Sequence, residues 1–148
     1  MRTVLAACLA LLIAYGCGGD PRPPVEISDV RIYAPLPGSN MSVAYLTIAN
    51  NTKEPLIIAE VSSPQFQTVE IHATTMTNDV ARMRQLDALT IPPAQATELR
   101  EGAEHLMLMG PVGEPVLGDP ITLFIRDIAG GEVVVRSNLE SRIKLDGQ

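Results

Sequence analysis

Four residues between positions 69 and 110 carry side chains that could hold a soft metal ion. They are two imidazoles, His72 and His105, and two thioethers, Met83 and Met107. Thioether sulfur is a soft, uncharged ligand that favours Cu(I) over harder ions. Zinc sites instead prefer thiolate, imidazole and carboxylate, and calcium and magnesium require oxygen ligands. Two imidazoles with two thioethers therefore predict a Cu(I) site.

The segments around these residues read as strands, which would position the ligands. In V-E-I-H (69–72) polar and apolar residues alternate, so Glu70 and His72 share one face. In H-L-M-L-M (105–109) the same period places His105 and Met107 on one face, while the two leucines point to the core. Strand residues i and i+2 lie about 6.6 Å apart, a gap that His and Met side chains can close onto one ion. His105 and Met107 therefore form a predicted two-ligand pair on a single strand.

Each candidate ligand also has an ordinary structural explanation. A lone histidine is most often a surface residue, and methionine is a common gap filler in cores. Met83 lies between two arginines. Met107 lies between two leucines whose side chains are expected to point into the core, so Met107 itself should point outward. Met76, in a predicted turn (T-T-M-T-N-D), and Met109, on the His105 face, are second candidates for soft contacts. Met41 is expected only to begin a strand.

The spacing of the four residues distinguishes a ligand set from four unrelated residues. Ten residues separate His72 from Met83, twenty-one separate Met83 from His105, and one separates His105 from Met107. This pattern, H-x10-M-x21-H-x-M, resembles the signature of the PCu(A)C (DUF461) periplasmic copper chaperones. The segments V-E-I-H, R-M-R, I-P-P and H-L-M-L-M-G resemble the same family. Some members carry a methionine after the first histidine, where this chain has Ala73.

The resemblance implies a cupredoxin-like Greek-key β-sandwich and a role in carrying copper. It further implies delivery toward the CuA centre of cytochrome c oxidase, with the CuA subunit and Sco-type proteins as partners. Two alternatives stay open: general periplasmic copper storage or resistance, and a metal-free envelope module that uses the sandwich as a scaffold. We expect a monomer.

The first residues are predicted to direct export. Arg2 precedes an apolar run over residues 4–14 that is too short to span a bilayer. A-Y-G-C then predicts a lipoprotein signal, residues 1–17, in which Cys17 becomes lipidated and anchors the protein to the membrane of the cell envelope. The alternative is an ordinary cleaved signal peptide. Residues 18–24, rich in Gly and Pro, predict an extended linker, and residues 25–145 the copper-binding domain.

Cysteine and charge exclude several classes of protein. Cys8 and Cys17 are the only cysteines, and both fall in the predicted signal, so the domain has no disulfide or thiolate site. A His2Cys blue-copper centre therefore cannot form. The net charge of −6 without a basic run makes nucleic acid a poor partner. Both histidines are assigned to metal, and no G-x-S-x-G elbow or phosphate loop occurs, so we expect no enzyme.

The remaining chain alternates short β patterns with turn signals. Gly130-Gly131, between I-T-L-F-I-R-D and E-V-V-V-R-S, predicts a hairpin. No long helical repeat occurs. The regular spacing of the segments predicts an all-β sandwich with an aliphatic core. The nine predicted strands are 25–34, 42–49, 55–62, 67–73, 80–87, 95–99, 104–109, 120–128 and 132–139.

Overall fold

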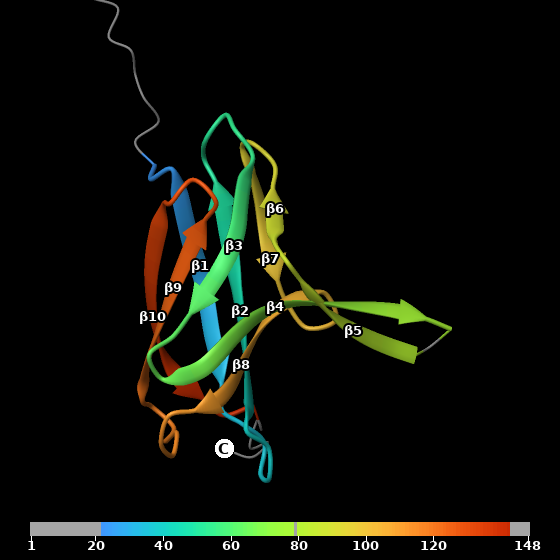
Figure 1. Cartoon of the computed structure of the whole chain (residues 1–148), viewed down its shortest axis with the longest axis vertical. Coiled ribbons are helices and arrows are strands. Elements are labelled where there is room, and N and C mark those ends of the chain that lie inside the picture. Colours follow the sequence, from blue (N-terminus) through green and yellow to red (C-terminus); the bar gives the residue numbers. More distant parts are fainter. Residues whose placement is uncertain (1–21, 79, 143–148) are drawn as a thin grey trace, which may run out of the picture.

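The computed structural model describes residues 22–78 and 80–142, and these residues form an all-β sandwich (Figure 1). The predicted signal, Cys17 and most of the linker lie outside the described residues. No helix of the described ranges is long and apolar enough to cross a membrane. The strands are β1 (Val25–Tyr33), β2 (Met41–Asn50), β3 (Leu56–Ser62), β4 (Phe66–Thr77), β5 (Val80–Leu86), β6 (Leu89–Ile91), β7 (Gln95–Leu99), β8 (Glu104–Pro111), β9 (Pro120–Asp127) and β10 (Glu132–Glu140).

The strands form two layers that join along one edge. In the first layer the order is β5-β4-β8-β2-β1, and β7 continues the line of β8 by pairing with the second half of β2. In the second layer the order is β10-β9-β3-β6. The layers meet where β1 runs parallel to β10, with Ile32 opposite Leu139. The predicted β-sandwich is therefore confirmed.

Apolar residues from both layers meet in the interior. Strands alternate buried and exposed positions because successive side chains point to opposite faces. Phe66 is the one aromatic side chain in the core of the described residues, so the expectation of an aliphatic core is confirmed. The largest fully buried hydrophobic side chains are Ile32, Leu46, Ile48, Ile91, Leu99, Leu106, Leu108, Leu123 and Ile125.

All nine predicted strands are present, and two details differ. A tenth strand, β6, has only three residues and was not predicted. Strand β4 continues to Thr77, so Met76 lies in a strand and not in the predicted turn. The turn comes at Asn78, whose φ of 51° is left-handed, a conformation that asparagine tolerates better than most residues.

The ends of β4 and β5 form a hairpin arm that projects from the side of the sandwich (Figure 1). Strand β8 pairs with β4 only as far as Ala73. Beyond that point residues 74–77 pair with residues 80–83, and only the backbone N–H of Thr74 still reaches the other side, where it donates to the carbonyl of Ala103 at 3.1 Å. We call these two segments the arm. They have a neighbouring strand on one side only, so the arm is held less firmly than the rest of β4.

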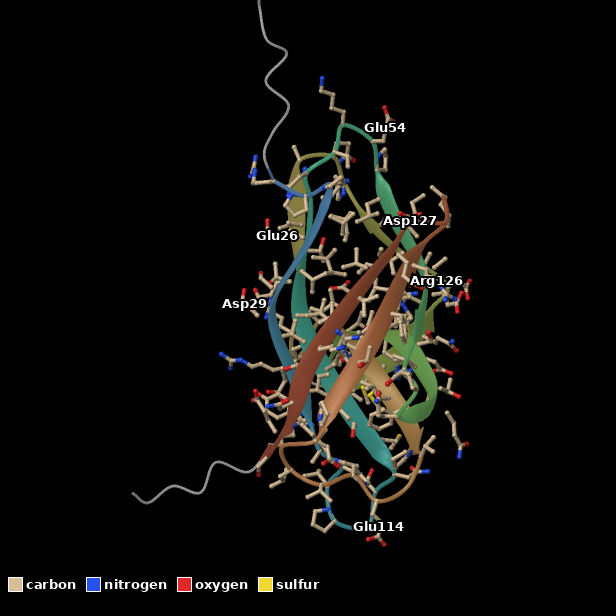
Figure 2. The ribbon with its side chains drawn as sticks, turned by 90° about the vertical axis from the view of Figure 1, so that its left-hand side faces the viewer. Glu26, Asp29, Glu54, Glu114, Arg126 and Asp127 are labelled. Atoms are coloured by element: carbon tan, nitrogen blue, oxygen red, sulfur yellow. The ribbon has the colours of Figure 1, made fainter. Side chains whose placement is uncertain are left out.

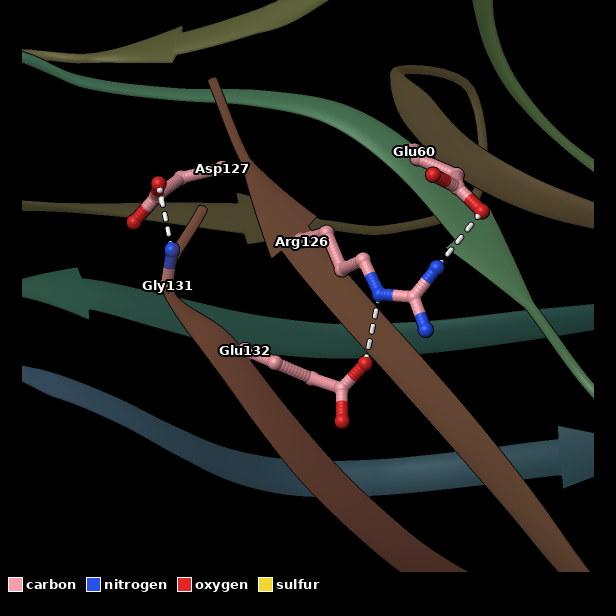
Figure 3. A network of polar contacts seen from close by, with 5 residues as sticks. All are labelled: Glu60, Arg126, Asp127, Gly131 and Glu132. Carbon is pink, nitrogen blue, oxygen red and sulfur yellow. Dashed lines mark hydrogen bonds and ion pairs between the residues drawn. The ribbon is translucent and has the colours of Figure 1, made fainter. Parts of the chain in front are cut away.

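The outer face of the second layer is joined by charged side chains (Figure 3). Nε of Arg126 on β9 donates to Glu132 Oε2 at 2.6 Å, and its Nη1 donates to Glu60 Oε1 at 3.0 Å. The carboxylate of Glu132 holds the pKa of Arg126 above its usual value. Asp127 Oδ1 accepts from the backbone N–H of Gly131 at 3.0 Å, which closes the predicted β9–β10 hairpin. These contacts tie β3, β9 and β10 together on the layer that does not carry the candidate ligands.

The described chain begins at one end of the sandwich. The backbone N–H of Asn51 donates to the carbonyl of Pro24 at 2.9 Å, so the first strand enters beside the loop that carries Glu54. Glu114 lies at the other end (Figure 2). The described chain therefore enters the sandwich at the Glu54 end.

Candidate metal centre

Strand register brings the four predicted ligands onto one face of the first layer. His72 on β4 lies opposite His105 on β8, and Met83 on β5 lies opposite Thr74, two residues after His72. Directly opposite residues of an antiparallel pair point to the same face, and so do residues i and i+2 of one strand. Met107 follows His105 by two. Segments that are far apart in the sequence therefore contribute to one surface.

The two histidines lie next to each other on this face. Their ring centroids lie 6.0 Å apart and the rings are tilted by 53°. His105 is only 5% exposed, so its side chain is buried although it lies on the outer face of the layer. Tyr45 on β2 approaches the other side of His105, with ring centroids 6.4 Å apart and an edge-on angle of 68°. Burial raises the pKa of the Tyr45 phenol, so this neighbour is uncharged at neutral pH.

A backbone carbonyl orients the His105 ring. Nδ1 of His105 donates to the carbonyl oxygen of Ala103 at 3.0 Å. A nitrogen bonded to a carbonyl must carry the proton, and in a neutral ring the other nitrogen then keeps its lone pair. Nε2 of His105 is therefore the nitrogen prepared to bind a metal, as in other sites where a histidine ligand is fixed by its second nitrogen.

A carboxylate holds the other histidine. Nε2 of His72 and Oε2 of Glu70 lie 2.8 Å apart, and both side chains are half-buried, at 19% and 25% exposure. In the neutral ring this bond places the proton on Nε2 and leaves Nδ1 with the lone pair. Glu70 was predicted to share the face of His72, without a role in the site. Its position two residues before His72 on a strand was the available signal.

Four methionines line a cavity of about 420 Å³. Neither histidine is in its lining, but Tyr45, the neighbour of His105, and Thr74, two residues after His72, are. Met83 and Met76 lie on the arm, and Met107 and Met41 lie on the body of the layer. Met83 is 63% exposed, whereas Met107 is half-buried. Met109 shares the face of Met107 but does not line the cavity, because it lies further along β8, opposite Met41. Of the two second candidates, Met76 lines the cavity and Met109 does not. Met41 also lines the cavity, although its position there was not predicted.

Comparison with known proteins identifies the family. The family model for LpqE-like lipoproteins matches residues 25–137. The chain belongs to the LpqE-like family. No curated protein matches it.

Solved structures similar to this LpqE-like protein include PCuAC domains. The copper-bound PCuAC domain from PmoF2 is 21% identical, covers 80% of this chain and 94% of its own, and has a TM-score of 0.66. The apo PCuAC domain from PmoF1 is 19% identical over 80% of this chain and 95% of its own, with a TM-score of 0.67. The solution structure of CuI-DR1885 from Deinococcus radiodurans is 22% identical over 88% and 85%, with a TM-score of 0.66. The resemblance to PCu(A)C proteins and the cupredoxin-like fold are confirmed.

The donor set of the LpqE-like chain suits a soft ion. Among residues 22–78 and 80–142, no group of three or more His, Cys, Asp and Glu side chains could hold a metal ion. Four donors are reached only when the thioethers of Met83 and Met107 join the two imidazoles. Such a shell carries no formal charge and binds soft ions such as Cu(I) in preference to hard ones.

Proposed function

We propose that this protein is a Cu(I) carrier of the bacterial cell envelope. One ion per chain binds to His72, Met83, His105 and Met107 and leaves by ligand exchange to an acceptor protein. The observation that carries the proposal is the register of β4, β5 and β8, which aligns all four residues on one face. The likeness to PCuAC domains described as copper-bound and CuI-bound adds support.

The neutral donors suit transfer better than storage. Thioethers need no deprotonation, so binding and release at Met83 and Met107 involve no proton. Met83 stands on the exposed arm, where the donor of an acceptor could replace it while the histidines still hold the ion. We propose the CuA centre of cytochrome c oxidase as the final destination, with Sco-type proteins acting alongside. The family resemblance is the support for these partners.

The location follows from the first residues. A lipid on Cys17 and the Gly- and Pro-rich linker behind it would hold the protein at the envelope membrane, and the lipoprotein family supports this. Two acyl chains give the stable attachment that a single chain does not. The linker would then limit how far the copper-binding domain can move from the membrane to meet an acceptor protein.

The test is a titration of the metal-free protein with Cu(I) in the presence of a competing chelator. We expect one tightly bound Cu(I) per chain and a mixed nitrogen and sulfur shell by X-ray absorption. A parallel titration with Zn²⁺ is the control for metal identity. Zinc that binds more tightly than Cu(I) under matched conditions, or a shell without sulfur, would refute the proposal.

A further inference from the structure

The cavity beside the histidines contains more thioethers than the ligand set uses. Of the five methionines in the described residues, four line it, and only Met109 does not. Met83 and Met107 belong to the proposed Cu(I) shell. Met41 and Met76 have no role in that shell.

These two extra methionines each lie next to a ligand methionine. Met76 follows Thr74 by two on β4, and Thr74 lies opposite Met83, so Met76 and Met83 are diagonal neighbours. Diagonal neighbours are about 7–8 Å apart and within reach of long side chains. Met41 stands in the same relation to Met107, because Val43 lies opposite Met107 on β8. The arm and the body thus each present one ligand methionine and one further methionine to the same space.

Ordinary packing does not account for the extra pair. Methionine is useful in cores because its flexible chain fills irregular gaps, but Met76 is 64% exposed and Met41 is 47% exposed. Both side chains instead line the cavity and remain exposed to solvent. The charged residues of its lining, Glu101 and Arg142, are paired with each other at 2.8 Å. Their charges offset one another, so the thioethers face no uncompensated positive charge from this pair.

We propose that Met41, Met76 and Met83 form a second soft-metal site, which we call the entry site, at the mouth of this cavity. It captures Cu(I) through three thioethers, and the ion then moves to the histidine pair as His72, His105 and Met107 replace Met41 and Met76. The ion stays Cu(I) throughout, and no proton is released, because every ligand exchanged is neutral. The inference rests on the proposed function for its cargo. Met83, common to both shells, remains bound during the exchange.

The entry site is weaker than the carrier site. Three thioethers offer fewer donors than two imidazoles with two thioethers, and all three entry ligands are exposed by about half or more and must be ordered on binding. The entry site therefore fills after the carrier site at equilibrium. Because Met83 is then bound to the first ion, Met41 and Met76 hold the second ion without it. During loading the reverse order holds, because the exposed thioethers meet the ion first.

The test follows the methionine methyl groups by NMR. The full chain with 13C-labelled methionine methyls is titrated with Ag(I), a soft ion with the same charge as Cu(I) and no competing redox chemistry. The first equivalent should shift the signals of Met83 and Met107. The second should shift those of Met41 and Met76, and should shift Met109 less, because Met109 lies opposite Met41 but outside the cavity.

Variants then separate the two sites. A Met41→Leu, Met76→Leu double variant should keep the first equivalent, lose the second, and load Cu(I) more slowly from a chelator. Met109→Leu is the matched control and should change neither step. Leucine preserves apolar volume and both positions are exposed, so the double variant should fold; the wild-type NMR titration needs no variant.

The outcomes distinguish the entry site from the carrier site. If only one equivalent binds, and Met41 and Met76 do not shift, the entry site is refuted while the carrier site stands. If Ag(I) shifts Met41, Met76 and Met83 but leaves both histidine ring signals unchanged, the carrier site is refuted and the entry site stands. Equal shifts at Met109 and Met76 would mean non-specific thioether binding and would also refute the entry site.

Discussion

The two thioether ligands should contribute unequally to Cu(I) affinity, because only one of them is held in place by the fold. Met107 is half-buried on β8, which is paired with β2 on one side and β4 on the other. Met83 is 63% exposed on the arm, where β5 pairs with β4 alone. Replacing either by leucine removes one sulfur donor and leaves apolar volume nearly unchanged. The difference between the two variants therefore measures how well each ligand is preorganised.

The size of that difference follows from side-chain entropy. Fixing a free methionine side chain costs about 1.5–2 kcal/mol, and an exposed Met83 bears most of this cost when the ion binds. Met107 has lost part of its freedom in the folded protein already. A difference of about 1.4 kcal/mol corresponds to a factor of ten in affinity. Met107→Leu should therefore weaken Cu(I) binding about tenfold more than Met83→Leu.

The assay is competition for Cu(I) against a chromophoric chelator at fixed pH. Both substitutions are made in a Met76→Leu background, so that the neighbouring thioether cannot take the place of Met83. Met109→Leu in the same background is the control for a methionine on this face that is not a ligand, and circular dichroism confirms folding. Equal losses for the two variants, or a greater loss for Met83→Leu, would refute the argument from preorganisation.

Four further predictions concern the surroundings of the site, the core and the anchor. Glu70→Gln should lower Cu(I) affinity by about tenfold, since partners that orient a histidine ligand typically contribute this much. Affinity is measured by competition with a chelator, and a higher affinity in the variant would mean that the carboxylate competes with copper for His72. Leu108→Ala, at a side chain with 0% exposure, should lower the free energy of unfolding by about 2–5 kcal/mol in urea melts, and a loss below 1 kcal/mol would contradict its place in the core. Cys17→Ala should move the protein from the membrane to the soluble fraction, and equal solubility of both forms would indicate an ordinary secreted protein. Burial raises the pKa of Tyr45, so its contribution to stability should be complete below about pH 10 and be lost as the pH rises through the raised value; urea melts on either side of pH 10 should show a smaller alkaline loss for Tyr45→Phe, and identical losses would contradict it.

The sequence predicted most of the fold because nearly every strand has one face against the core. Alternation reveals such strands, and it fails where a core face is missing or too short. Strand β6 has only three residues, between Ala88 and Pro92, which is too few to show a period. The end of β4 was interpreted as a turn because residues 74–77 lie in the arm, where neither face packs into the interior.

The candidate site shows a similar limit. Spacing indicated four ligand residues, and register places them on one face. The group that orients His105 is the carbonyl of Ala103, and a carbonyl leaves no trace in the sequence because every residue has one. Met41 could not be connected to the site either, since its place at the cavity depends on how β2 pairs with β8.

The two ligand strands differ in how freely their sequences can change. In β8, His105 and Met107 serve the proposed metal, and the leucines between and after them are buried in the core. Gly110 has a left-handed φ of 62°, and an added Cβ would come within 2.9 Å of the Gln67 side chain.

In β5, by contrast, residues 80–85 are all exposed. Substitutions in β8 must therefore satisfy the fold and the metal together, while most of β5 outside Met83 can vary without loss of either. A lineage of such proteins could thus adjust how copper is received and released by changing β5 and its turn. The half of the site that β8 provides would be inherited almost unchanged.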